Sequence, residues 1–330
     1  MSQLQQSEHE VETLEGAADS QGPKVEGRTP WQLFWGRFRH DWIAIVALAW
    51  VILLIWAAIL APLFVRFVAH RGPNDIRPEL SNDFNIPVIG PGSVFGGGVD
   101  QPGRDVFVRT LYGARTSLQV ALLATAISVV IGLALGLLGG YFGGKTDTFT
   151  SRLTDIFLAL PVFLLAIGIS ASCGISINGC LGGLLRPGTW LVTLIIALFG
   201  WTYIARIVRG QTLSLREREF VEAARATGFG RTHIMLREIL PNLLAPLIVY
   251  TTLLIPVNII FEASLSYLGV GIPPGTPSWG KMISDATEGK LYLHAWWMLL
   301  FPGMMLVFTT LAFNLVGDAL RDALDPKSGR

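Results

Sequence analysis

The sequence contains little cysteine, histidine or charge. Its 330 residues include two cysteines, Cys173 and Cys180, and five histidines, which are too few for a disulfide framework or a Cys/His metal cluster. Charged residues make up only 15% of the chain and leave a net charge of +1, so no nucleic-acid partner is expected. No catalytic triad or acidic pair can be argued either. The chain is therefore expected to be neither an enzyme nor the holder of a cofactor or metal.

Apolar residues dominate the composition. They make up 51% of the sequence and give a mean hydropathy of +0.51, which is too apolar for a soluble domain. A helix needs about 20 mostly apolar residues to cross a membrane. Six uncharged runs therefore predict an all-α membrane protein with six spans: Trp42 to Val65, Thr116 to Gly144, Ile156 to Leu185, Pro187 to Ala205, Ile239 to Phe261 and Ala295 to Gly317. The third span should end near Cys173, because a polar, glycine-rich loop follows it.

The flanking segments complete this topology. Residues 1–29 carry six acids and two bases, so they lack the basic start and apolar core of a signal peptide and predict a disordered tail. Residues 30–41 place aromatic side chains on one face beside two arginines, which favours a helix in the membrane interface over an extension of the first span. Residues 66–115 predict an external loop rich in glycine and proline that ends in a second interfacial helix. Residues 319–330 predict a second terminal tail.

The placement of lysine and arginine predicts the orientation. With the N-terminus inside, the inner segments hold 16 of the 25 Lys and Arg residues, and positively charged loops stay on the cytoplasmic side. Both termini are therefore predicted to be cytoplasmic. The span interiors are uncharged, which argues against a transporter coupled to ions or protons.

The stretch GGYFGGKT, Gly139 to Thr146, fits the phosphate-loop pattern G-x-x-x-x-G-K-[ST]. A working phosphate loop follows a β-strand and opens a soluble helix, so that its N–H groups converge on a nucleotide. Here one predicted span precedes the stretch and another follows within a dozen residues. The sequence therefore predicts a glycine-rich turn between membrane helices, with Lys145 near lipid headgroups.

The longest charged loop lies between the fourth and fifth predicted spans. Arg216 to Thr227 predicts a helix with Ser214 as its N-cap and Gly228 at its C-terminal end. Phe220, Ala223 and Ala224 share one narrow face with Thr227. From periodicity alone, a solvated charged hairpin and a docking surface both remain open.

Several motifs together give this chain a family resemblance. Glu222-Ala223-Ala224, Gly228 and Ile239-Leu240-Pro241 resemble the EAA signature of ATP-binding-cassette (ABC) importer permeases. The stretches GRDVFVRTLYGARTSL, ARIVRGQTLSLREREFVEAA, FEASLSYLGVG and GDALRDALDPK resemble the C-type subunit of oligopeptide and dipeptide permeases, and the resemblance covers about residues 25 to 327. FGGGVDQPGRD departs from the compact turn usual before GRD, which puts the outer loop's contact with a binding protein in doubt.

The resemblance implies a type I ABC importer permease in a bacterial inner membrane, with a core at 116–318 and a coupling loop at 209–241. The implied partners are a B-type permease subunit, two ATPase subunits that carry ATP and magnesium, and an external binding protein that delivers peptide. It also implies that five residues meet the ATPase: Phe220, Glu222, Ala223, Ala224 and Gly228. Nickel chelates or oligosaccharides are the alternative solutes, and a membrane-embedded ATPase is the alternative class.

Three further features remain open at this level. Pro246 and Pro256, with Pro241, predict a kinked or partly broken fifth helix that either lines the pathway or merely tolerates proline. Glu262 fits a structural role at the outer boundary better than a role in the solute path. Cys173 and Cys180 would lie outside, where either a disulfide or a buried Cys173 with a free Cys180 is consistent with the sequence.

Overall fold

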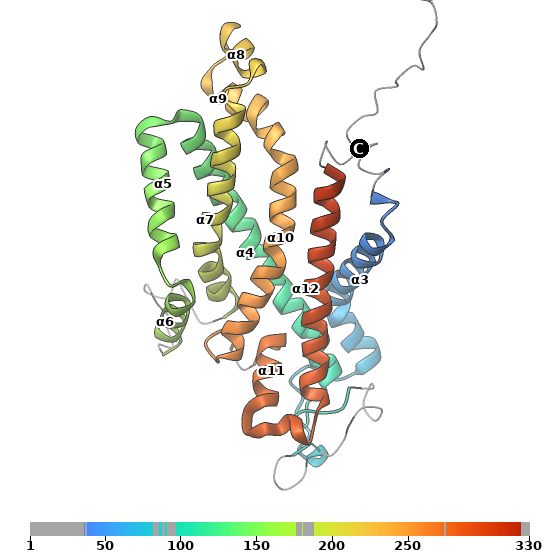
Figure 1. Cartoon of the computed structure of the whole chain (residues 1–330). Coiled ribbons are helices and arrows are strands. Elements are labelled where there is room, and N and C mark those ends of the chain that lie inside the picture. Colours follow the sequence, from blue (N-terminus) through green and yellow to red (C-terminus); the bar gives the residue numbers. More distant parts are fainter. Residues whose placement is uncertain are drawn as a thin grey trace, which may run out of the picture.

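The chain is described by a computed structural model that covers residues 36, 38–81, 86–87, 90, 97–175, 180, 188–273 and 275–324. The described elements are nearly all helical: α3 (Trp42–Phe64), η1 (Val65–Ala69), η2 (Pro78–Leu80), α4 (Val106–Phe142), α5 (Gly144–Ala159), α6 (Val162–Ile175), α7 (Thr189–Leu215), α8 (Glu219–Ala226), α9 (Arg231–His233), η4 (Ile234–Ile239), α10 (Leu240–Tyr267), α11 (Trp279–Thr287), η5 (Glu288–Leu293) and α12 (Trp297–Leu324). The long helices run between an end that carries α8 and an end that carries α11 (Figure 1).

The predicted membrane-spanning character is confirmed. Five helices are long and apolar enough to cross a membrane, and the pair α5 and α6 adds a sixth if it is taken as one bent span. Large apolar side chains in the middle of these helices point outward; Trp56 is 58% exposed and Val130 67% exposed. Such a surface suits lipid or another membrane subunit.

The second span begins earlier than predicted. Instead of an interfacial helix followed by a span from Thr116, α4 is one helix of 37 residues that starts at Val106. The Asp105 carboxylate caps it by accepting a hydrogen bond from the Val108 N–H at 3.0 Å. Arg109 lies in its first turns and is only 1% exposed, so this charge is paired inside the protein and does not end the helix.

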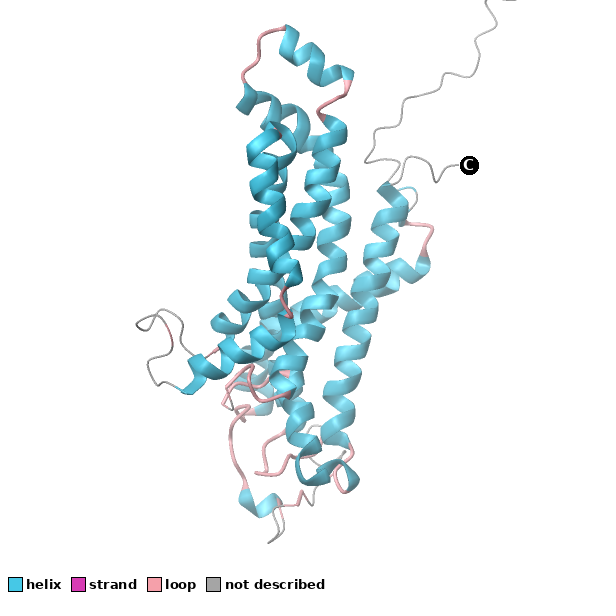
Figure 2. Ribbon diagram, turned by 60° about the vertical axis from the view of Figure 1, so that its left-hand side comes forward, coloured by secondary structure: helices cyan, strands magenta, loops and turns pink. Residues whose placement is uncertain are grey.

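The third span was predicted as one helix from Ile156 to near Cys173, but the structure divides this region between two helices. It is broken between α5 and α6, whose axes differ by 78°, and α6 turns away from the line of α5 (Figure 2). Leu160 has an extended backbone (φ −76°, ψ 138°), as expected for a residue that precedes proline. Pro161 therefore sets the position of the break.

Other boundaries also differ from the prediction. α7 continues to Leu215, so Ser214 is inside a helix and is no N-cap. α10 continues past Pro246 and Pro256 without interruption, so the fifth span is not partly broken; the irregular part is the π-helical turn η4 just before it. The predicted C-terminal tail begins late, because α12 runs to Leu324.

The first and last described segments of the chain lie close together. Phe38 and Ala44 pack against Ala319 and Ala323, and the start of α3 and the end of α12 lie at the same end of the bundle as α8 (Figure 1). Residues 1–29, 325–330 and most of the predicted interfacial helix at 30–41 are outside the described residues.

Candidate functional site

The coupling loop forms a short helix, α8, that is attached to the bundle by one face. Val221 and Ala224 are buried in an apolar cluster with Ile234 and Ile239 from the following turns. Phe220, Glu222, Ala223 and Gly228 are exposed. α8 is therefore held by its own chain on one side and leaves the other side free.

A glycine ends α8 in the predicted place. Gly228 has φ +87°, and its N–H donates to the Arg225 carbonyl at 3.0 Å, while the Phe229 N–H donates to the Ala224 carbonyl at 3.2 Å. These two bonds form a Schellman motif, which glycine favours because φ is positive. The Phe229 ring stacks on His233 with centroids 4.3 Å apart, which fixes the path of the chain into α9.

One predicted docking residue lies on the inner face. Ala224 is 7% exposed and packs inside the chain, so it supports α8 and is not part of its free surface. The predicted face, with Phe220, Ala223, Ala224 and Thr227, lies beside the buried face, with Val221 and Ala224. The two faces share only Ala224. The exposed members of the predicted set are Phe220, Glu222, Ala223 and Gly228.

A cleft of about 450 Å³ lies between α5, α6, α7 and α10. Its polar lining consists of Thr202, Tyr203, Tyr250 and Asn258. The Tyr203 and Tyr250 rings meet edge to face, with centroids 6.4 Å apart. Asn258 donates a hydrogen bond to Thr125 Oγ1 at 2.8 Å. Among the described residues, the walls of this cleft carry no charge.

None of the three residues that the sequence left as possible pathway residues lines this cleft. Pro246 borders a much smaller cavity beside α7, and Pro256 is buried. Glu262 is fully buried, at 0% exposure, where its carboxylate accepts hydrogen bonds from Ser117 at 2.8 Å and Ser266 at 2.7 Å. Glu262 thus joins α10 to α4 in a structural role. Asn258 was missed, although a lone amide in an apolar run was a visible signal.

The phosphate-loop pattern forms a joint between two helices. Its first residues end α4, Gly143 and Gly144 have φ of +65° and +54°, and α5 starts at Gly144. Lys145 is exposed. No β-strand precedes this turn in the described part of the chain; the residues that match the pattern belong to two helices and the turn between them, whereas a phosphate loop follows a strand.

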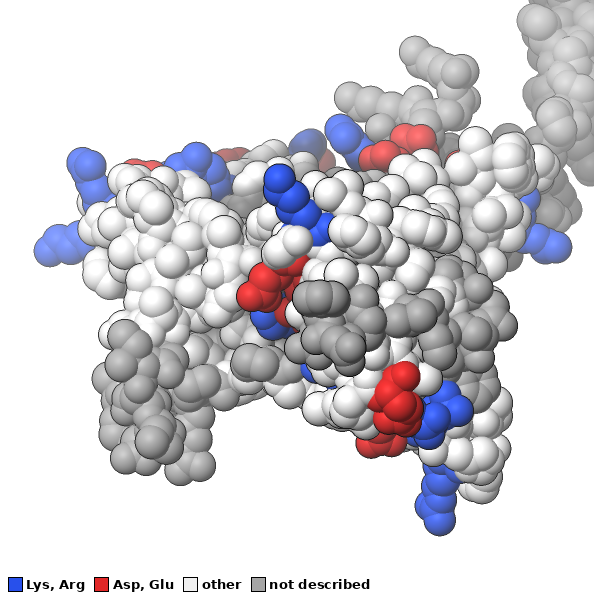
Figure 3. All heavy atoms as spheres, turned by 90° about the horizontal axis from the view of Figure 1, so that it is seen from below, with Lys and Arg blue, Asp and Glu red and all other residues white. Residues whose placement is uncertain are grey.

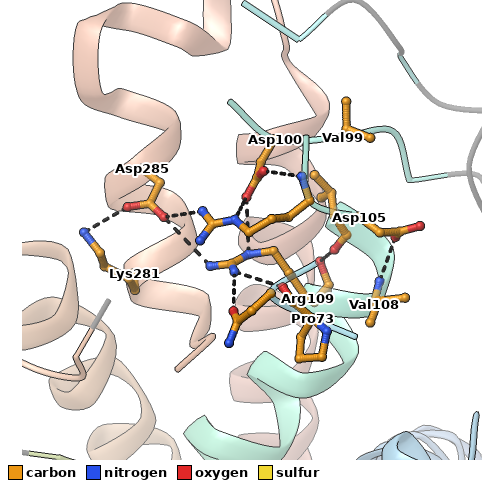
Figure 4. Close-up of polar contacts among 12 residues, drawn as sticks. Pro73, Val99, Asp100, Asp105, Val108, Arg109, Lys281 and Asp285 are labelled. Atoms are coloured by element: carbon orange, nitrogen blue, oxygen red, sulfur yellow. Dashed lines mark hydrogen bonds and ion pairs between the residues drawn. The ribbon is translucent and has the colours of Figure 1, made fainter. Parts of the chain in front are cut away.

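An ionic cluster fixes the end of the bundle that carries α11 (Figure 4). Asp100 Oδ2 lies 2.7 Å from Arg104 Nε and 3.4 Å from Arg109 Nε. Asp285 on α11 lies 2.9 Å from Lys281 Nζ and 3.7 Å from Arg104 Nη2. Burial raises the pKa of Asp100, and the two arginines oppose that rise. Opposite charges thus tie the loop before α4 to α11.

Two family descriptions match this architecture. Residues 118–330 match the family "Binding-protein-dependent transport system inner membrane component". Residues 29–81 match "N-terminal TM domain of oligopeptide transport permease C". The chain belongs to the ABC importer permeases of the dipeptide/oligopeptide family. Members of this family are transport subunits, and separate ATPase subunits of the importer hydrolyse ATP.

Similar proteins agree with this assignment. The "Glutathione transport system permease protein GsiD" of Escherichia coli O1:K1 / APEC is 41% identical over 300 residues, which cover 91% of each chain. The protein of that name from Shigella boydii serotype 4 (strain Sb227) is also 41% identical over 300 residues and 91% of each chain. The structure "Inward facing conformations of the MetNI methionine ABC transporter" (CY5 native crystal form) aligns with a TM-score of 0.52 at 19% identity, covering 64% of this chain and 94% of that one. The permease thus has the type I importer fold.

The sequence did not decide between a disulfide and a free Cys180, and the permease contains the disulfide. Cys173, at the end of α6, is bonded to Cys180, with Cα atoms 4.9 Å apart. The bond lies at the end of the bundle away from α8, like α6 in Figure 1. Seen from the α11 end, acidic and basic side chains occupy only a few places on a largely uncharged face (Figure 3).

Proposed function

We propose that this permease imports peptides, pairs with a second, non-identical permease subunit, and is driven by two ATPase subunits that dock on α8. The observation that supports this most directly is the two-sided character of α8. Val221 and Ala224 anchor it in the bundle, while Phe220, Glu222 and Ala223 remain exposed. A helix attached in this way can receive a partner on one side and pass its movement to the bundle on the other. ATP and magnesium belong to the partner, and this chain needs no cofactor.

The α8 docking surface can be tested by reversing one charge. Glu222→Lys should weaken binding of the ATPase subunits by about 30-fold, the effect of losing a central interface residue. Glu217→Lys is the matched control, because Glu217 is 67% exposed and precedes α8. Binding is measured by titrating the ATPase subunits onto the permease pair in detergent. Equal effects of the two changes, or no effect of Glu222→Lys, would contradict docking on α8.

Peptide is the proposed solute for two reasons. The relatives named above are glutathione permeases, and glutathione is a small peptide. The uncharged cleft with its two tyrosines places no fixed charge in the path, which suits solutes that share a peptide backbone and differ in their side chains. Mass spectrometry of the ligand that copurifies with the cognate binding protein tests this. A sugar or a nickel chelate in that protein would overturn the peptide assignment.

The α8 end and both termini are proposed to be cytoplasmic, with the binding protein approaching the α11 end. The excess of Lys and Arg on the α8 side supports this orientation. Labelling with a membrane-impermeant maleimide in spheroplasts tests it, because both native cysteines are bonded. A cysteine introduced at Glu288, beside α11, should react, and one at Thr227 should not. The reverse pattern would contradict the proposal.

A further inference from the structure

The end of α4 is packed against α7 through direct contact of the two backbones. Gly132, Gly136 and Gly140 are spaced four residues apart along α4. A Cβ atom at these glycines would lie 2.7, 2.6 and 2.9 Å from the carbonyl oxygens of residues 201, 205 and 209 of α7. Such distances leave no room for a side chain. α4 and α7 must therefore move as one body.

α5 is attached to this body at separate points: Thr150 lies against Gly139 of α4, and the Phe157 ring packs on Phe199 and Trp201 of α7. Its connection to α4 is the turn at Gly143 and Gly144, whose positive φ values are typical of glycine. A polar hollow of about 180 Å³ lies between α5 and the α4–α7 body, lined by Thr150, Thr154 and other side chains. The hollow separates part of α5 from the α4–α7 body, so the turn at Gly143 and Gly144 can act as a joint.

One ion pair spans this hollow at its end. Both Arg209 Nε and Arg209 Nη2 donate to the Asp147 carboxylate, the latter to Oδ2 at 2.8 Å. The two side chains are only 34% and 23% exposed, and such a two-bond arrangement fixes the orientation of both partners. A second pair between the same helices, Arg206 and Asp155, has a single bond of 3.2 Å and is 61% and 58% exposed.

The same region of α7 is connected to α8. Arg216 follows α7, and its Nη1 donates to the Gly140 carbonyl of α4 at 3.1 Å. The Arg216 carbonyl accepts a hydrogen bond from Arg225 of α8 at 3.4 Å. Val221 of α8 shares an apolar cluster with Leu137 of α4. A displacement of α8 is thus passed to the α4–α7 body.

We infer that the Asp147–Arg209 pair is the positioning contact that carries movement of α8 from the α4–α7 body to α5, and hence to the wall of the cleft. Leu158 near the end of α5 and Val162 at the start of α6 line that cleft. With the pair intact, α5 follows the body. Without it, the glycine joint lets α5 lag behind, so that ATP is consumed without a matching opening of the cleft. This inference rests on the proposed docking of ATPase subunits on α8.

The test uses the complete transporter, with a spin label on α5 at Ile156 and another on α12 at Leu311, which are 59% and 50% exposed. The distance between the labels is measured by pulsed electron resonance, with and without ATP, using ATPase subunits that bind but do not hydrolyse it. We expect ATP to shift the distance between the labels. Asp147→Asn should lower the ratio of shifted to unshifted complexes about fivefold. Asp155→Asn is the matched control and should leave the shift unchanged.

The outcomes separate the inference from the proposed function. An unlabelled control first shows by co-elution that each variant still assembles with its ATPase subunits. A missing shift in the transporter with an unchanged ion pair would overturn the proposed coupling itself. A normal shift in Asp147→Asn, or an equal loss in Asp155→Asn, would overturn only the role of this pair. If Asp147→Asn fails to assemble, the charges of the pair are exchanged instead. The double variant Asp147→Arg with Arg209→Asp is compared with Arg209→Asp alone. Recovery of the shift in the double variant supports the inference, and absence of recovery overturns it.

Discussion

Replacing Glu262 by alanine should destabilise the permease far more than replacing it by glutamine. Its carboxylate is fully buried and accepts one hydrogen bond each from Ser117 and Ser266. Alanine would leave two serine hydroxyls without this acceptor, at about 1 kcal/mol each, and would add a cavity worth about 2 kcal/mol. The expected loss in the free energy of unfolding is therefore about 4 kcal/mol.

Glutamine keeps most of these interactions. Its Oε1 still accepts from one serine, and the other serine hydroxyl can turn to accept from the new amide, so the expected loss is about 1 kcal/mol. Ser266→Ala should also be costly, because this hydroxyl receives the Ile272 N–H as well, at 3.4 Å. Ser264→Ala is the control, since its hydroxyl only donates to the Ile260 carbonyl on the same helix.

The measurement is reversible unfolding of the purified permease in mixed micelles of mild detergent and sodium dodecyl sulfate, followed by circular dichroism. Equal losses for Glu262→Ala and Glu262→Gln would refute the hydrogen-bond reasoning, because only the alanine variant lacks an acceptor. A harmless Glu262→Ala would refute the structural role altogether.

Three other predictions concern different parts of the fold. Thiol labelling of the denatured, unreduced protein should detect no free cysteine, and two labelled residues would contradict the Cys173–Cys180 bond. Gly136→Ala should lower the free energy of unfolding by about 2 kcal/mol, because the added Cβ meets the α7 backbone; Gly210→Ala, where the space is open, should cause no loss. Arg109→Ala should cost about 3 kcal/mol by leaving its buried carboxylate partner with one counter-charge fewer, and an unchanged unfolding curve would exclude this role.

The sequence predicted the number of spans well because apolar runs are a local property. The start of α4, in contrast, is not determined by the local sequence. Arg109 in a run such as RDVFVRTLYGAR favours the membrane surface, but it is neutralised by Asp100 and by Asp285, the latter more than 170 residues away. Such pairing across the fold cannot be read from a window of residues. The break at Pro161 was different, because the effect of proline on the preceding residue was a visible local signal.

Part of the candidate site was predictable in the same way. The end of α8 at Gly228 follows from glycine's tolerance of positive φ. The side of α8 that faces the bundle did not follow from periodicity, because alanine fits either a buried or a docking surface, and Ala224 proved to be buried. The cleft was missed because its walls come from four helices, and a single segment, even one with a lone amide such as Asn258, does not show which other helices it faces.

The glycine joint between α4 and α5 has a consequence for scanning membrane proteins by pattern. Gly139 lies where a Cβ would meet Thr150 Oγ1 at 2.3 Å, and Gly144 supplies positive φ at the turn. Helix packing and the tight turn between α4 and α5 thus account for glycines at the spacing of the phosphate-loop pattern. A lysine at the membrane surface then supplies the last residue type that the pattern requires. Pattern searches over helical membrane proteins should therefore collect spurious nucleotide sites at such reversals. A required preceding β-strand would remove them.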